Sequence, residues 1–282
     1  MTQVIKNFNC FQMSVFFQNS LKDLLENKKD EVKLGSTITF AEQVSLSGAR
    51  KFSNMDQDLF YDWYSSKSRK CHYEVITTDK PKKLFLDIDL DKTDTDIHSL
   101  GELVINLVKF SSVSITRLTG VEVSREDWLL LNSSSMTKGS FHAVLSHQHL
   151  RFQSISNMKS LVLYLIESFE TEIGPLTTKK GSIKKIVDTS CYKSNQNLRI
   201  LFSSKLGSSR TLEVDDRDEN ILKHTTENDI DITKSIFSSS LITSSTKYPR
   251  FFDPMPCFSE IFKSSSKTHT HIDNCLLYTS PS

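Results

Sequence analysis

Residues 84–91 of this chain read LFLDIDLD, and this stretch decides most of what the sequence predicts about the fold. Apolar and acidic residues alternate with the two-residue period of a β-strand that is buried on one face. Asp87 and Asp89 therefore project from one face of the strand, and their apolar neighbours project from the other. Two carboxylates in apolar surroundings need a positive partner. A hard cation such as Mg²⁺ or Mn²⁺ suits them, although a strand end with solvated acids gives the same pattern.

Strand and helix patterns alternate on both sides of this stretch. Strand patterns cover HYEVIT at 72–77, WLLLNSS at 128–134, GSFHAVLSH at 139–147, IKKIVDTSCY at 183–192 and NLRILFSSK at 197–205. Helix patterns cover 1–30, 56–65, 97–117 and 155–173. The alternation predicts an α/β or α+β fold without deciding between parallel and antiparallel pairing. Residues 215–246 are polar, and we expect them to leave the core as a surface segment.

The amino-acid composition limits which classes of protein this chain can belong to. The chain has 282 residues and 37% hydrophobic content, which is enough for a real core. A net charge of +1 gives no global signal for nucleic acid, so any such binding needs local basic patches. Five cysteines, an odd number in a long chain, do not form a disulfide framework. With no secretory signal and no apolar run near the ~18 residues of a membrane span, we expect an intracellular protein of a reducing compartment, without membrane attachment.

A second motif lies in TKGSFHAVLS, residues 137–146. Ser140 and His142 share one face of the predicted strand, while Phe141 packs on the other. A hydroxyl beside an imidazole is a donor pair that suits phosphate oxygens, and Lys138 adds a positive charge just before it. A histidine that is simply satisfied inside the core is the competing interpretation of His142.

A third group follows in IVDTSCYKSNQNLRILFSSK, residues 186–205. We place Asp188 on a strand, after two apolar residues. Arg199 and Lys205 share parity if the next strand runs through Ser203. A third carboxylate and two cations would complete a site for metal ions and a triphosphate. Each cation taken singly is equally compatible with a solvated surface charge.

In this order, the three motifs resemble the archaeo-eukaryotic primase superfamily, and within it the eukaryotic and viral primase-polymerase (PrimPol) group. The resemblance covers about residues 50–215, including HYEVI, VSREDWLLLNSSS and VDTSCYKSNQNLRILFSSKLG. It implies a catalytic core of two α/β units, one with a sheet like that of an RNA-recognition motif, with the active site in the cleft between them. By resemblance, the metal ligands and catalytic carboxylates are Asp87, Asp89 and Asp188, and the nucleotide-binding residues are Lys138, Ser140, His142, Arg199 and Lys205.

The activity implied by the resemblance is DNA-directed primase and polymerase chemistry. Such a protein uses two Mg²⁺ or Mn²⁺ ions to join nucleoside triphosphates on a single-stranded DNA template. It would act in primer synthesis, replication restart, translesion synthesis or damage tolerance, in the nucleus or mitochondrion of a eukaryote. A single-strand-binding protein is a further partner to test. The alternatives are a non-catalytic primase-like protein for DNA binding or assembly and a phosphohydrolase of the haloacid dehalogenase type. Asp91 stands where that phosphohydrolase family has Thr or Val.

Two positions depart from the family pattern. Animal members usually carry glutamate where this chain has Asp89, although aspartate is frequent in viral members. The Asn-Arg-Asn run of the family reads Asn195-Gln196-Asn197 here, so one cation near the nucleotide or template is lost.

The sequence divides into a helical N-terminal region at 1–45, a catalytic core at 46–245 and a tail at 246–282. The tail holds a loose set of possible zinc ligands, Cys257, His269, His271 and Cys275, with no common zinc spacing. Relatives carry a downstream zinc module, and we expect the chain to end before it. The expected basic patches for the template are Arg50-Lys51, Lys67 to Lys70, Lys82-Lys83 and Lys179 to Lys185. Trp63, Tyr61 and Tyr64 could stack on bases, but helix packing is the favoured use.

Overall fold

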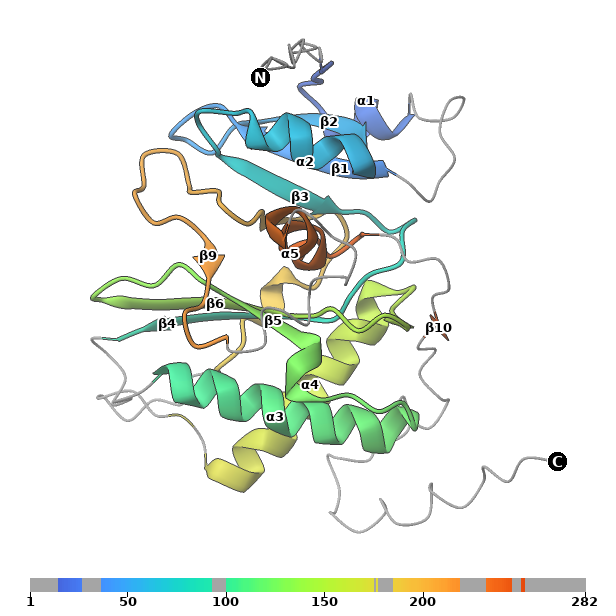
Figure 1. Cartoon of the computed structure of the whole chain (residues 1–282), viewed down its shortest axis with the longest axis vertical. Helices are drawn as coiled ribbons and strands as arrows, with labels where there is room; N and C mark the ends of the chain where they lie inside the picture. The colour runs from blue at the N-terminus through green and yellow to red at the C-terminus, as the bar shows by residue number, and fades with distance from the viewer. Residues whose placement is uncertain are drawn as a thin grey trace, which may run out of the picture.

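Two four-stranded antiparallel sheets organise the computed structural model, which describes residues 15–26, 37–92, 100–174, 176, 185–218, 232–244 and 250–251 (Figure 1). The first sheet has the order β2-β1-β3-β8 and comprises β2 (Arg50–Asp56), β1 (Thr37–Gln43), β3 (His72–Ile76) and β8 (Gln196–Arg199). The second has the order β4-β6-β5-β9 and comprises β4 (Phe85–Asp91), β6 (Lys138–Leu145), β5 (Trp128–Asn132) and β9 (Glu213–Val214). A short parallel pair joins β7 (Leu150–Arg151) to β10 (Arg250–Phe251). Both four-stranded sheets are antiparallel, so the mixed helix-and-strand prediction is confirmed in its α+β form, and the two-unit core with a cleft between its units stays a prediction.

The described helices are α1 (Leu21–Glu26), α2 (Gln57–Ser65), α3 (Leu100–Thr119), α4 (Ile155–Ile173) and α5 (Ile232–Ser240), with short 3₁₀ turns η2 (Arg125–Asp127) and η3 (Thr189–Cys191). Three of these helices, α2, α3 and α4, lie where the sequence patterns place them. Ser154 caps α4 by accepting from the backbone N–H groups of residues 156 and 157. Gly174 ends it with a φ of 87°, a conformation that glycine adopts without strain. The helices predicted at 56–65 and 155–173 are therefore confirmed.

One hydrophobic core fills the space between the second sheet and helices α3 and α4, which lie together on one face of that sheet (Figure 1). From β4 it takes Leu86, Ile88 and Leu90, as the alternation in residues 84–91 predicts. From β5 it takes Trp128 and Leu130.

A second cluster, which we call the inter-sheet core, joins the opposite face of the second sheet to the first sheet. Its members are Ile38, Phe40, Phe60, Trp63, Tyr64, Leu129, Leu131, Ile200, Leu201, Leu212, Ile236, Phe237 and Leu241. The strand β5 is thus buried on both faces, which explains its unbroken apolar run. Trp63 and Tyr64 are used for packing, as favoured from the sequence.

The described parts of the polar segment at 215–246, which are residues 215–218 and 232–244, do not leave the core, and the expectation is wrong for them. The helix α5 lies between the two sheets (Figure 1), where Ile236 and Phe237 are buried. Its far end is held by Glu74 of β3, whose carboxylate accepts from the backbone N–H groups of Ile242 and Thr243, both at 2.7 Å. The anchor is tertiary, so the local composition of the segment carried no sign of it.

The lysines at 82 and 83 do not form a surface patch for the template, and this expectation is also wrong. Lys80, Lys82 and Lys83 are only 3%, 1% and 3% exposed. Their ammonium groups donate to backbone carbonyls, including those of Ser238 and Ser239 at the end of α5. These lysines hold the linker between β3 and β4 against neighbouring backbone, including the end of α5.

Several predictions fall on other parts of the chain. The strand β1 lies within residues 1–45, so this region is not helical throughout; the three-part division itself stays a prediction. Residues 1–14, Lys179 to Lys184 and the Cys/His set of the tail lie outside the described residues. None of the helices within the described ranges is long and apolar enough to cross a membrane.

Candidate active site

The two sharpest motifs of the sequence lie on adjacent strands. The strands β4 and β6 pair antiparallel, and the register places Asp87 opposite His142 and Asp89 opposite Ser140. Cross-strand partners share a face of the sheet, so the four side chains form one patch. His142 in turn pairs with Leu131 of β5, which belongs to the inter-sheet core. The patch therefore lies on the face of the second sheet that is turned toward the first sheet.

Asp188 reaches the same patch through its backbone. Its N–H donates to the carbonyl of Asp87 at 2.7 Å, which fixes residue 188 beside the strand that carries the other two acids. The expected strand at 183–192 is wrong, because Asp188 is the cap of η3 and its carboxylate accepts from the backbone N–H of Ser190 at 2.8 Å. Ile186 and Val187 are buried in the core, which accounts for their strand-like apolar pattern.

Three cations act on these acids: Lys138, Arg199 and Lys205. The ammonium of Lys138 lies 2.7 Å from a carboxylate oxygen of Asp89. Arg199, at the end of β8 in the first sheet, donates to the hydroxyl of Ser133, in the loop after β5 of the second sheet, at 2.8 Å.

Lys205 lies in a loop, and not on the strand that the sequence predicted. The expected continuous strand through Ser203 is wrong, since β8 ends at Arg199 and Phe202 adopts a φ of 67° in the turn that follows. The backbone N–H of Phe202 then donates to the carbonyl of Leu212. Lys205 lies in the resulting loop, where it acts electrostatically on Asp89 and Arg199.

The pKa of Asp87 reflects its burial among these charged groups. Burial raises the pKa of Asp87 to about 7, and the charges of Asp188 and Asp89 add to the rise. Arg199 and Lys205 oppose it without cancelling it. The rise comes mainly from burial, and the two neighbouring carboxylates reinforce it.

His142 is a neutral imidazole in this setting. Burial, together with the charges of Arg199 and Lys205, lowers the pKa of His142 to about 3. Its Nε2 lies 3.6 Å from a carboxylate oxygen of Asp87, which is beyond hydrogen-bond length. Among the described residues, buried His142 Nδ1 and Arg199 Nε have no hydrogen-bond partner. Two buried polar nitrogens left in this way beside one patch are what a polar ligand or ordered water would satisfy.

The donor set suits a divalent cation in its chemistry. Oxygen ligands are those that Mg²⁺ and Mn²⁺ take, and a cation would relieve the repulsion between Asp87 and the carboxylates of Asp188 and Asp89. Within the part of the chain that the structure describes, no three His, Cys, Asp or Glu side chains are already gathered as a metal cage. Lys138 holds Asp89 and a backbone N–H holds Asp188, so these two carboxylates would have to turn to share an ion. Metal binding therefore stays a prediction.

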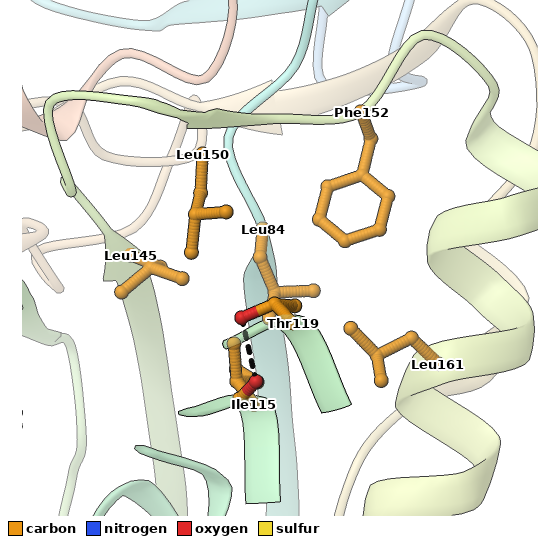
Figure 2. Close-up of a pocket in the computed structure, with 7 residues that line it drawn as sticks. All are labelled: Leu84, Ile115, Thr119, Leu145, Leu150, Phe152 and Leu161. Atoms are coloured by element: carbon orange, nitrogen blue, oxygen red, sulfur yellow. Dashed lines mark hydrogen bonds between the residues drawn. The ribbon is translucent and has the colours of Figure 1, made fainter. Parts of the chain in front are cut away.

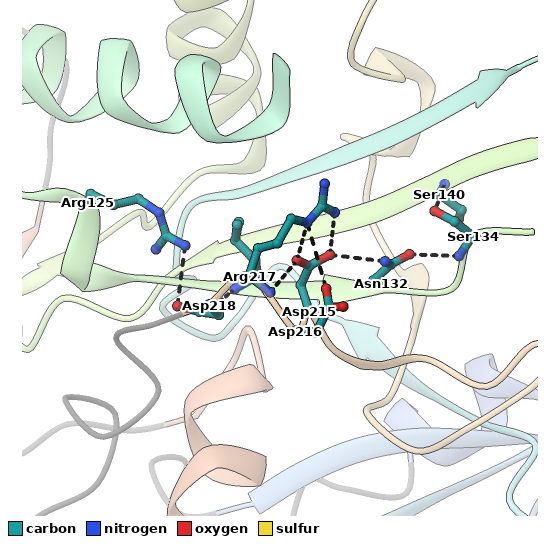
Figure 3. Close-up of polar contacts among 9 residues, drawn as sticks. Arg125, Asn132, Ser134, Ser140, Asp215, Asp216, Arg217 and Asp218 are labelled. Carbon is teal, nitrogen blue, oxygen red and sulfur yellow. Dashed lines mark hydrogen bonds and ion pairs between the residues drawn. The ribbon is translucent and has the colours of Figure 1, made fainter. Parts of the chain in front are cut away.

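A polar network behind the patch was not assigned from the sequence (Figure 3). Arg217 donates twice to the carboxylate of Asp215, at 2.8 and 2.7 Å, and Asn132 donates to the same carboxylate at 3.0 Å. The amide oxygen of Asn132 then accepts from the backbone N–H of Ser134, whose hydroxyl accepts from the backbone N–H of Ser140. The only sequence signal was the polar run NSSS that follows an apolar strand.

A small apolar pocket lies elsewhere in the fold (Figure 2). It is lined by Leu84, Ile115, Thr119, Leu145, Leu150, Phe152 and Leu161. The hydroxyl of Thr119 donates to the carbonyl of Ile115 at 2.8 Å, so no lining side chain offers a free polar contact. Most of these residues belong to the core between the second sheet and its helices, which separates the pocket from the carboxylates.

Comparison with known proteins finds no matching family model. The chain is 23% identical over 260 residues to a DNA-directed primase/polymerase protein of Danio rerio, covering 80% of this chain and 49% of that protein. It is 26% identical to a helicase/primase complex protein of African swine fever virus, covering 57% of this chain and 16% of the relative. A human DNA-directed primase/polymerase protein is 28% identical, covering 43% of this chain and 23% of the relative. The chain spans at most about half of these relatives, and the resemblance predicted from the motifs is confirmed.

Proposed function

We propose that this chain is the catalytic core of a DNA-directed primase-polymerase, which joins nucleoside triphosphates on a single-stranded DNA template. The observation that carries the proposal is the register of β4 and β6, which pairs Asp87 with His142 and Asp89 with Ser140, with Asp188 tied to the same strand. Motifs that lie about 50 residues apart in the sequence become one patch of acids, donors and cations. The similarity to two primase/polymerase proteins supports the same reaction.

The proposed roles follow from the chemistry of each group. Two Mg²⁺ or Mn²⁺ ions, when bound by the three carboxylates, would neutralise the triphosphate and lower the pKa of the attacking 3′-hydroxyl. Ser140 and neutral His142 would donate to phosphate oxygens, which an imidazole with a low pKa can do without adding charge. Arg199 suits bidentate phosphate contact, and Lys138 and Lys205 act as point charges.

The test is incorporation of labelled nucleotides on single-stranded DNA, with and without an annealed primer, in Mg²⁺ and in Mn²⁺. Asp87→Asn removes one charge and keeps the side-chain shape, so we expect products to fall at least about a hundredfold. Its stability should be unchanged or higher, because burial and like charges already oppose the ionised carboxylate. Asp58→Asn, at an exposed site on α2, is the matched control and should keep full activity.

The outcomes separate the remaining possibilities. Products that form without a primer would mean that this core primes unaided, and products only with a primer would mean that priming needs a further module. A folded wild-type protein with no products under any condition would favour the non-catalytic alternative. Products that are unaffected by Asp87→Asn would refute the site.

A further inference from the structure

Ser133 links two groups of the proposed nucleotide site that come from different sheets. Its hydroxyl oxygen accepts from Arg199 Nη2 at 2.8 Å, and its hydroxyl donates to Ser140 Oγ at 3.2 Å. Ser133 is 4% exposed and Ser140 is 7% exposed, so water does not compete freely for either hydroxyl. The two residues are also joined through the backbone, where the N–H of Ser133 donates to the carbonyl of Ser140 at 2.9 Å.

The direction of this chain of hydrogen bonds is fixed at its cationic end. A guanidinium can only donate, so Ser133 Oγ must accept from Arg199. The single proton of Ser133 is then directed to Ser140 Oγ, which accepts it. The proton of Ser140 is left over and must be donated onward. These hydrogen bonds therefore present the hydroxyl of Ser140 as a donor at the patch. A phosphate oxygen is an acceptor and requires such a donor.

A second hydrogen bond, made by its backbone N–H, holds Ser140 in place. Its N–H donates to Ser134 Oγ at 3.0 Å, and Ser134 is tied through Asn132 to Asp215 (Figure 3). The side chains of Asp215 and Asn132 thus fix the loop after β5, and this loop carries Ser133. Ser133 and Ser134 thus support Ser140 through its side chain and its backbone.

We propose that Ser133 is a positioning residue that orients the hydroxyl of Ser140 as a donor toward the triphosphate and couples it to Arg199. The inference rests on the proposed function, because it concerns the same nucleotide site. Ser133 itself does not touch the nucleotide. Its effect passes through Ser140, which distinguishes it from a residue that contributes only to stability.

The experiment is a titration of the folded protein with a fluorescent nucleoside triphosphate in the presence of Mg²⁺, using wild type, Ser133→Ala, Ser140→Ala and the double variant. Without Ser133, Ser140 is free to turn its proton toward other acceptors. We expect Ser133→Ala to weaken binding about tenfold, the equivalent of one oriented hydrogen bond to a charged group. The effects of Ser133→Ala and Ser140→Ala should not add in the double variant, because Ser133 acts through Ser140.

A matched control is Ser112→Ala. Ser112 is also buried and makes two hydrogen bonds, donating to the carbonyl of Val108 and accepting from Trp128 Nε1, but it lies in the helical core. It should lower stability and leave nucleotide affinity unchanged. If Ser133→Ala does not fold, Ser133→Thr and Ser133→Val make the same comparison, since they match in volume and differ in the hydroxyl.

Each result has a separate meaning. Affinity that is lost in the alanine or valine variant and kept in the threonine variant supports the inference. Nucleotide affinity that stays at the wild-type level in Ser133→Ala or Ser133→Val, or effects that add in the double variant, overturns the inference and leaves the proposed function standing. A folded wild-type protein that binds no nucleoside triphosphate overturns the proposed function itself.

Discussion

Glu74→Gln tests the tertiary anchor that holds α5 between the two sheets. The carboxylate of Glu74 is 2% exposed and accepts three hydrogen bonds: 2.7 Å from the N–H of Ile242, 2.7 Å from the N–H of Thr243 and 2.6 Å from the hydroxyl of Thr243. Glutamine has one acceptor oxygen, so its NH₂ group must face at least one of these donors. A lost charge-assisted bond costs about 1.5–3 kcal/mol, and a buried donor without a partner costs about 1–3 kcal/mol. Because the two effects overlap, we expect a loss of about 3 kcal/mol.

The assay is urea unfolding followed by tryptophan fluorescence, since Trp63 lies in the inter-sheet core that α5 helps to fill. Thr243→Val is the control, because it removes only the hydroxyl bond and should cost about 1 kcal/mol. Limited proteolysis should cut the glutamine variant faster near α5 than the control. A Glu74→Gln variant that is as stable as Thr243→Val would refute the reasoning, because Glu74 would then not be the main anchor.

Two further predictions concern charge. Burial lowers the pKa of His72 to about 4, well below its usual 6.5, so the unfolded state binds a proton that the folded state does not between these values. Stability should therefore fall as pH drops from about 6.5 to 4, by at most about 3 kcal/mol from this residue. Unfolding at several pH values should show a flatter profile for His72→Phe, and an unchanged profile would contradict the assignment. Lys138→Met removes the cation that occupies Asp89, so calorimetry should show Mn²⁺ binding up to about fivefold tighter. Lys92→Met, whose ammonium contacts only the carbonyl of Ser135 among the contacts described, is the control; equal effects in both variants would mean general charge rather than displacement.

Local patterns were sufficient for β4 and for the helices α2 and α4. The alternation in residues 84–91 predicted β4 and the shared face of Asp87 and Asp89, and the register with β6 bears out that face. The helix at 155–173 was bounded correctly because its apolar face begins at Ile155 and Gly174, a local stop signal, ends it. Such signals depend on residues within one turn or one strand, which a sequence displays directly.

Patterns failed where apolar residues are buried without regular structure. Ile186 and Val187 look like a strand and are core residues before a 3₁₀ turn. The run after Arg199 looks like a continuing strand, but the chain turns at Phe202. Burial and strand pairing leave the same apolar trace in a sequence, so only the presence of a pairing partner separates them.

The sequence by itself determined the inventory of the proposed site: three carboxylates, the Ser-His pair and the flanking cations. The tertiary structure decided which of these groups meet and in what state. It paired β4 with β6, tied Asp188 to Asp87 and left Lys82 and Lys83 inside the fold. It also brought Arg199 of the first sheet to Ser133, in the loop after β5 of the second. The physical reason is that residue type fixes which bonds a side chain can make, whereas partners distant in the chain fix which of those bonds it does make.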